Sequence, residues 1–229
     1  MSITTNIQEL QQELRPIGVE LVAISKTKSV EDILEAYNAG QRVFGENQVQ
    51  ELLAKQESLP QDIAWHMVGH LQTNKVKYIA PFISLIHSVD SFKLLQEINK
   101  HAEKNNRIID CLLQVFIAEE TTKFGLDHVE VIEILENPAL NTLKNIRIRG
   151  LMGIATHTDN QKEIKEEFYE LKTLFDGIKV SYFRKETTFD ILSMGMSDDY
   201  KIAIGQGSTM VRLGSTLFGK RVVKHYKTQ

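Results

Sequence analysis

A lysine near the N-terminus is the side chain best suited to covalent chemistry. Lys26 continues the alternating phase of Val22 and Ile24, so a strand with that face inward would direct its amine into the protein. A lysine in such a place must be paired or neutral. A neutral lysine condenses with carbonyls, and Lys28 two residues on would lower its pKa further. On this segment alone, a lysine that reaches solvent remains an alternative.

Small and hydroxyl residues gather near the C-terminus. Ser193 ends one apolar run, Gly207-Ser208-Thr209 precedes the next, and Arg212 lies within that run, followed by Gly214-Ser215-Thr216. Backbone N–H groups and Ser/Thr oxygens in such turns can hold a phosphate, although Gly and Ser are also ordinary turn formers. An amine facing a phosphate site indicates a phosphorylated aldehyde bound as an imine. Pyridoxal 5′-phosphate (PLP) and aldolase-type sugar phosphates are the two candidates.

Other polar residues support this site less directly. Asn47 offers a donor and an acceptor to a ring substituent, and His70 is a candidate acid/base group, although a lone histidine is more typical of a structural hydrogen bond. His66 and His87 fall inside predicted strands and are expected in the core or an interface. The histidines lack metal spacing such as HExxH. The single cysteine, Cys111, excludes an internal disulfide and a cysteine-based metal cage.

Composition excludes several classes of protein. The 229 residues are 42% hydrophobic and 25% charged with a net charge of −3, so a sizeable core can form and a disordered chain is excluded. The charge balance argues against a protein that binds nucleic acid by neutralising phosphates. No apolar run approaches the roughly 18 residues of a membrane span, and the N-terminus does not resemble a leader. We expect one cytoplasmic domain spanning residues 1–229.

The elements that must position these residues alternate regularly. Helical patterns cover 30–39, 92–104 and 164–175, an extra helix containing Ile7, Leu10 and Leu14 precedes the first strand, and 181–188 is predicted to be a loop. Eight apolar runs are predicted to be strands: 19–25, 42–45, 63–69, 85–89, 108–117, 146–154, 189–194 and 209–214.

Strands that alternate with helices pair in parallel through right-handed crossovers. Eight such units predict a single α/β domain of the (β/α)8 TIM-barrel type with an extra N-terminal helix. An open doubly wound sheet is the alternative, but the regular spacing and the absence of GxGxxG after the first strand disfavour it. In a barrel, residues at the C-terminal ends of strands form the site.

Seven segments carry a resemblance to a known family. They are LVAISKTK (21–28), FGENQVQE (44–51), WHMVGHLQTNK (65–75), HSVDS (87–91), RGLMGIAT (149–156), LSMGMSDDY (192–200) and GSTMVRLGSTLFGKR (207–221). In these segments and their order, the chain resembles the YggS/PROSC family of PLP homeostasis proteins. One departure is Gln48, where the family commonly has Tyr, and this change bears on the packing of the cofactor ring.

The resemblance implies a fold like the N-terminal barrel of alanine racemase, with PLP bound as a Schiff base on Lys26. It implies phosphate contacts from Ser193 and from Gly207-Ser208-Thr209. It also implies that Arg212 faces the pyridine nitrogen and that Lys28 and Lys123 lie near the cofactor.

Arg212 has a chemical consequence. An arginine stays cationic and should keep the pyridine nitrogen unprotonated, which makes PLP a poorer electron sink. Alanine racemase adds a tyrosine base from a second domain, and this chain leaves no room for one after its last strand. We therefore expect a monomeric, non-enzymatic PLP carrier that acts in PLP and amino-acid homeostasis. Its partners would be PLP and PLP-dependent apoenzymes, without nucleic acid or membrane.

Two other functions remain open. One is a weak PLP-dependent racemase or decarboxylase that recruits a base from Lys123, His70 or a partner subunit. The other is a Schiff-base aldolase in which Lys26 attacks a sugar phosphate directly.

Overall fold

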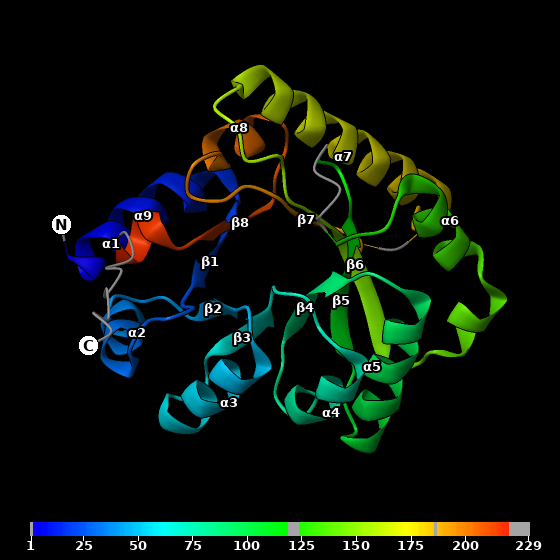
Figure 1. Cartoon of the computed structure of the whole chain (residues 1–229), viewed down its shortest axis with the longest axis horizontal. Helices are drawn as coiled ribbons and strands as arrows, with labels where there is room; N and C mark the ends of the chain where they lie inside the picture. Colours follow the sequence, from blue (N-terminus) through cyan, green and yellow to red (C-terminus); the bar gives the residue numbers. More distant parts are fainter. Residues whose placement is uncertain (1, 119–123, 186, 220–229) are drawn as a thin grey trace, which may run out of the picture.

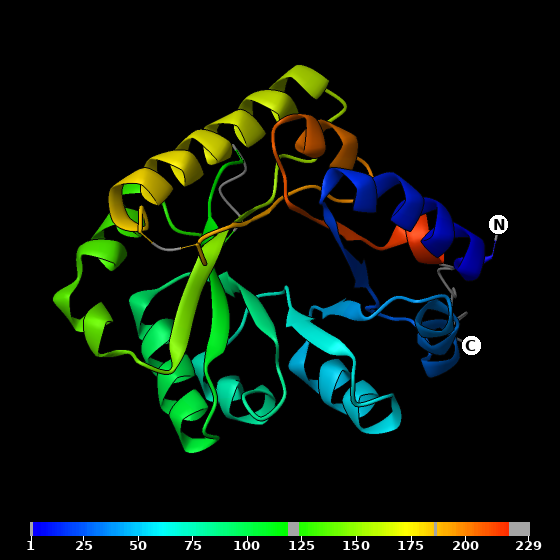
Figure 2. The same cartoon turned by 180° about the vertical axis from the view of Figure 1, so that it is seen from behind.

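A closed barrel of eight parallel strands forms the centre of the protein. The computed structural model describes residues 2–118, 124–185 and 187–219. Each strand pairs with the next along the chain, and β8 pairs with β1 to close the barrel. Figure 1 shows the helices surrounding the strands, and Figure 2 shows the same arrangement from behind. The TIM-type prediction is therefore confirmed, and the open sheet was the wrong alternative.

The strands have the following bounds: β1 Glu20–Ile24, β2 Val43–Glu46, β3 Ala64–Met67, β4 Leu85–Val89, β5 Ile109–Val115, β6 Ile146–Gly153, β7 Ile191–Ser193 and β8 Met210–Leu213. The helices are α1 Ile3–Leu14, α2 Val30–Asn38, α3 Val49–Ser58, α4 Val76–Ile79, α5 Phe92–Lys104, α6 His128–Glu136, α7 Gln161–Tyr182, α8 Tyr200–Gly205 and α9 Ser215–Phe218. The predicted N-terminal helix is α1, which buries Ile7, Leu10 and Leu14.

Two predicted boundaries differ from the structure around β7. Helix α7 continues to Tyr182, beyond the expected end at 175 and into the expected loop, because Ile178 extends its buried face by one turn. Strand β7 is shorter than 189–194. Phe189 is buried outside the strand and stacks on Phe175 and Phe183, with ring centroids 4.9 and 4.4 Å apart. An apolar residue beside a strand can thus belong to the helix layer.

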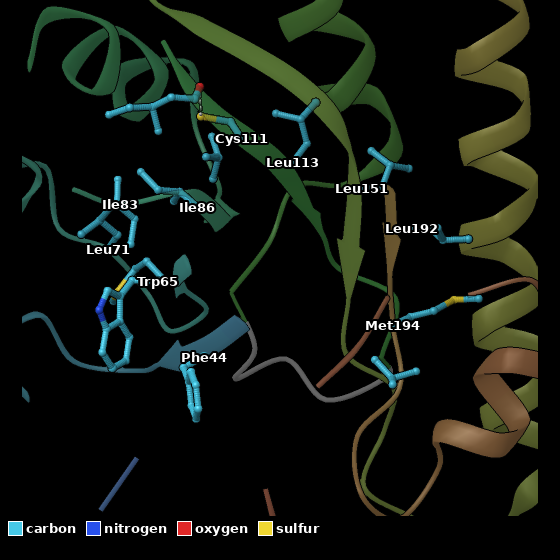
Figure 3. Close-up of a cluster of buried hydrophobic side chains, with 14 of the residues drawn as sticks. Phe44, Trp65, Leu71, Ile83, Ile86, Cys111, Leu113, Leu151, Leu192 and Met194 are labelled. Carbon is cyan, nitrogen blue, oxygen red and sulfur yellow. Dashed lines mark hydrogen bonds between the residues drawn. The ribbon is translucent and has the colours of Figure 1, made fainter. Parts of the chain in front are cut away.

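The barrel has an inner and an outer core. Figure 3 shows part of the outer one, in which Phe44, Trp65 and Leu151 lie among other buried side chains between strands and helices. The inner cluster fills the barrel and consists of Val22, Ile24, Leu85, Leu112, Met152 and Met210. Val22 and Ile24 face inward while Ala23 belongs to the outer core, as the alternation of a strand requires.

Membrane-spanning helices and metal-binding clusters are both absent from the described part of the chain. None of the described helices is both long and apolar enough to cross a membrane. The described residues also bring together no group of three His, Cys, Asp or Glu side chains able to hold a metal ion.

Candidate functional site

A cavity of about 480 Å³ opens at the C-terminal end of the barrel. Its walls come from the ends of β1, β2, β3, β6, β7 and β8 and from the loops after them, which is where a TIM barrel carries its functional residues. The lining residues are Ile24, Lys26, Thr27, Lys28, Asn47, Val68, Ile154, Met196, Ser197, Asp198, Arg212, Gly214, Ser215 and Gly219. Four predicted site residues, Lys26, Lys28, Asn47 and Arg212, are thus brought together.

Strand β1 and the turn after it supply the two lysines. Lys26 follows the inward-facing Ile24 and lines the cavity, as the alternation predicts. The backbone N–H of Lys28 donates to Ser25 O at 3.0 Å, which closes a turn over residues 25–28. Lys28 Nζ donates to Phe218 O at 3.2 Å, so its ammonium group contacts α9 at the cavity edge.

Asn47 reaches the cavity through a close approach between two loops. A Cβ added to Gly69 would lie 2.3 Å from the carbonyl oxygen of Asn47, so only glycine permits this packing. The next residue, His70, does not line the cavity. Its Nδ1 lies 3.0 Å from Asp90 Oδ2, and its ring stacks on Phe124 with centroids 4.3 Å apart. These contacts give His70 a structural hydrogen bond, the alternative that a lone histidine favoured.

Arg212 places a fixed positive charge in the cavity wall. It is buried, and its Nη1 donates to Ser193 O at 2.8 Å and Ser193 Oγ at 2.7 Å, while Nη2 donates to Gly153 O at 3.0 Å. Burial lowers the pKa of Arg212 to about 10, although the charge of Asp199 opposes this shift. The guanidinium is therefore cationic at neutral pH, and three hydrogen bonds fix its orientation.

Ser193 lies behind Arg212 and does not line the cavity. Its Oγ is 3.0 Å from His87 Nδ1, and His87 Nε2 is 3.0 Å from His66 Nδ1. Burial lowers the pKa of His66 to about 3 and that of His87 well below its ordinary value, with His66 and Arg212 adding to the effect on His87. Both rings are therefore neutral core residues, and Ser193 links them to Arg212.

The predicted Gly207-Ser208-Thr209 segment lies at the N-terminal end of β8, away from the cavity. Thr209 O accepts a hydrogen bond at 2.9 Å from the backbone N–H of Glu20, the first residue of β1. Gly207 faces α7, since a Cβ added there would lie 2.7 Å from the side chain of Lys172. The structure does not bring this segment together with Lys26. Lys123, the remaining predicted residue, lies outside the described residues.

The hydroxyls at the cavity come instead from residues after β7 and β8. Ser197 and Ser215 line it together with Gly214. Ser197 Oγ accepts hydrogen bonds from the backbone N–H groups of Gly214 at 3.2 Å and Thr216 at 3.3 Å. Gly214 and Ser215 belong to a turn that the sequence itself offers for a phosphate, whereas the resemblance implied phosphate contacts from Ser193 and Gly207-Ser208-Thr209. The available signal for Ser197, Gly214 and Ser215 was their position after a strand, because only that end of a parallel strand reaches the mouth.

These donors fit a small molecule that carries an aldehyde and a phosphate. Lys26 supplies an amine, Ser197, Gly214 and Ser215 supply hydroxyl and backbone groups of the kind that hold phosphate, and Arg212 supplies a fixed cation. All of them face one cavity, whose volume lies within the usual range for small-molecule sites.

Comparison with known proteins agrees with this geometry. The family described as "Alanine racemase, N-terminal domain" matches residues 1–222, which defines the class of barrel. Two proteins named pyridoxal phosphate homeostasis protein are similar over most of their length. The one from Aquifex aeolicus is 42% identical, covering 88% of this chain and 87% of its own. The one from Vibrio alginolyticus is 38% identical, covering 96% and 98%.

A solved structure extends the similarity to three dimensions. PipY of Synechococcus elongatus, solved with PLP bound, is 36% identical, covers 95% of this chain and 100% of its own, and superposes with a TM-score of 0.85. The chain therefore belongs to the pyridoxal phosphate homeostasis protein family.

Proposed function

We propose that this protein binds PLP as a Schiff base on Lys26 and acts in PLP and amino-acid homeostasis without catalytic turnover. The observation that carries the proposal is that Lys26, the cationic Arg212 and the hydroxyls of Ser197 and Ser215 line one cavity. Relatives of nearly the same length carry the homeostasis name, and the similar PipY structure has PLP bound.

Different cavity residues are assigned to different parts of the cofactor. PLP supplies an aldehyde that condenses with an amine, and Lys26 provides that amine. Ser197 and Ser215 would bind the phosphate beside Gly214, Arg212 would face the pyridine nitrogen, and Asn47 would contact a ring substituent. Ser193 acts through Arg212, which it orients by two hydrogen bonds.

The non-catalytic part of the proposal rests on charge. With a pKa of about 10, Arg212 keeps its proton at neutral pH, and its positive charge would keep the pyridine nitrogen unprotonated. Efficient PLP chemistry needs an electron sink and a matched acid/base group. The buried His66 and His87 are not in the cavity lining, and His70 is bound to Asp90. Among the described cavity residues, a weak racemase or decarboxylase would be left with the lysines or Asp198 as its base, and otherwise it would need Lys123 or a partner subunit.

Borohydride trapping tests the binding mode. The purified protein with PLP should lose its imine absorbance on reduction, and peptide mapping should place the adduct on Lys26. Lys26→Ala should lose the adduct while retaining PLP non-covalently, and the matched control Lys28→Ala should keep the adduct on Lys26. An adduct of full yield in Lys26→Ala would overturn the assignment.

The carrier role needs separate measurements. Mixing the PLP-loaded protein with a PLP-dependent apoenzyme should activate the apoenzyme faster than free PLP at equal concentration, and an equal or slower rate would reject transfer. Incubation with a panel of amino acids in deuterated water should give no exchange of the α-proton beyond that with free PLP. Exchange at a catalytic rate would favour an enzyme.

A further inference from the structure

A buried ionic cluster lies directly behind the turn that carries Lys26. It joins Glu46 at the end of β2 to Glu51 and Lys55 of α3. Lys55 Nζ is 2.7 Å from Glu46 Oε1, 2.6 Å from Glu51 Oε1 and 2.7 Å from Ser25 O. The side chain of Lys55 is 7% exposed and that of Glu46 is 0% exposed. The three contacts of Lys55 Nζ match the three N–H donors of an ammonium group.

The cluster contacts the main chain on both sides of Lys26. Before it, Ser25 accepts from Lys55 through its carbonyl and donates its hydroxyl to Glu46 Oε1 at 2.6 Å. After it, the backbone N–H of Thr27 donates to Glu51 Oε1 at 2.5 Å. The residues flanking Lys26 are thus held by side chains that are not in the cavity lining.

Thr27 has a backbone conformation that needs such support. Its φ is +64°, in the left-handed region, where a β-branched residue is a genuine outlier. In the turn closed between Ser25 O and Lys28 N, this third position ordinarily selects glycine or asparagine. A strained residue persists where its surroundings determine it, and the Glu51 carboxylate on its N–H is a contact suited to that role.

The cluster is poorly explained as a device for stability alone. Burying an ion pair costs desolvation that its attraction often fails to repay. In addition, Glu46 Oε2 is buried and has no hydrogen-bond partner among the described residues. What the cluster does provide is a fixed position for the main chain around Lys26.

We propose that the Glu46–Lys55–Glu51 cluster is a positioning device that holds the Ser25–Lys28 turn in its left-handed form and so aims the Lys26 amine into the cavity. This inference rests on the proposed role of Lys26. Without the Glu51 contact, Thr27 would relax towards negative φ and the turn would open, which would displace Lys26 from its geometry for attack on an aldehyde.

The rate of imine formation tests the proposal on the full-length chain freed of PLP. After PLP is added, absorbance gives the rate constant, borohydride trapping identifies the modified residue, and urea unfolding of the PLP-free protein measures stability separately. Glu51→Ala should slow imine formation on Lys26 by about tenfold or more, because small misplacements of reacting groups are costly in rate. Glu51→Gln retains an oxygen acceptor for Thr27 N and should stay within about threefold of wild type.

A second substitution separates positioning from general stability. Glycine adopts the left-handed region freely, so Thr27→Gly introduced into Glu51→Ala should recover most of the lost rate. Thr27→Val, which keeps a β-branched side chain, should recover none. If Glu51→Ala does not fold, Glu51→Asp keeps the charge beside Lys55 with a shorter reach and should show the same slowing and the same rescue.

Each outcome has a defined meaning. A wild-type rate in Glu51→Ala, or equal rates for the Gly and Val double variants, would overturn the positioning role while leaving the Schiff base on Lys26 intact. Absence of any trapped adduct on Lys26 in the wild-type protein would instead overturn the proposed function, and the positioning role with it.

Discussion

Strand β8 has the same tripeptide at both ends, and the two copies behave differently. Gly207-Ser208-Thr209 precedes the strand and Gly214-Ser215-Thr216 follows it. In the first copy the hydroxyls bind the main chain: Ser208 Oγ donates to Met194 O at 2.8 Å, and Thr209 Oγ1 accepts from Leu192 N at 2.8 Å. In the second copy Ser215 is exposed and lines the cavity.

The difference shows that strand direction, not residue type, decides which hydroxyls face a ligand. All strands of the barrel are parallel, so everything that follows a strand gathers at the mouth and everything that precedes one lies towards the other end. The first tripeptide stabilises β7 and β8 against each other. The second lines the cavity through Gly214 and Ser215.

The largest effect should come from placing a negative charge in the second tripeptide. We expect Ser215→Asp to weaken PLP binding about 100-fold, or about 2.7 kcal/mol, because a carboxylate would face the phosphate across a short distance. The matched variant Thr209→Asp in the first tripeptide should change PLP affinity by less than about threefold. Equilibrium titrations with PLP measure the affinity of both variants. Equal losses of affinity would contradict the different roles of the two tripeptides.

The sequence predicts the fold well because the signals for it are local and repeated. Each apolar run before a helical pattern predicts one unit, and eight units imply closure. The same alternation predicts an inward-facing Lys26; Val22 and Ile24 do lie in the inner core, and Lys26 lines the cavity. Errors arise where tertiary packing decides, as at Phe189, whose apolar side chain stacks on two rings of the helix layer.

The site is predicted less completely than the fold, because some of its residues are positioned by contacts between segments that lie far apart in the sequence. Ser197 reaches the cavity by accepting N–H groups from Gly214 and Thr216, and no local pattern encodes that pairing. The Glu51 contact to Thr27 likewise joins a helix to a turn 24 positions earlier. Glycine and serine types alone point equally to both tripeptides, so the position after the strand was the deciding information.

The buried histidines behind Ser193 should make the free energy of unfolding depend on pH. His66 has a pKa of about 3 in the folded protein and near 6.5 when unfolded. Between these values the unfolded state binds the extra proton, so stability falls as pH falls below about 6.5.

From pH 6.5 to 5 this histidine should remove about 1.5–2 kcal/mol of folding free energy. Urea unfolding at several pH values gives the slope. In His66→Asn the slope between pH 5 and 6.5 should be shallower, whereas Ser215→Ala at the mouth should leave it unchanged. An identical slope in wild type and His66→Asn would mean that His66 is not neutral in the fold.

Removing a hydroxyl from the first tripeptide should affect stability and not binding. Ser208 is buried, and the substitution Ser208→Ala leaves Met194 O without this side-chain donor, which typically costs about 1–2 kcal/mol. Urea unfolding without PLP measures this loss. The PLP affinity of the folded variant should equal that of wild type, and weakened binding with unchanged stability would place Ser208 at the ligand after all.

The smallest effect is expected for Ser215→Ala, which should weaken PLP binding and leave stability nearly unchanged. Ser215 is exposed, so the folding free energy should change by less than about 0.5 kcal/mol. Loss of one hydroxyl from the phosphate contacts should weaken PLP binding about threefold to tenfold, the value of a single hydrogen bond. Inorganic phosphate, which competes for the same contacts but cannot form an imine, should lose affinity by a similar factor. An unchanged phosphate affinity together with weaker PLP binding would mean that Ser215 contacts another part of the cofactor.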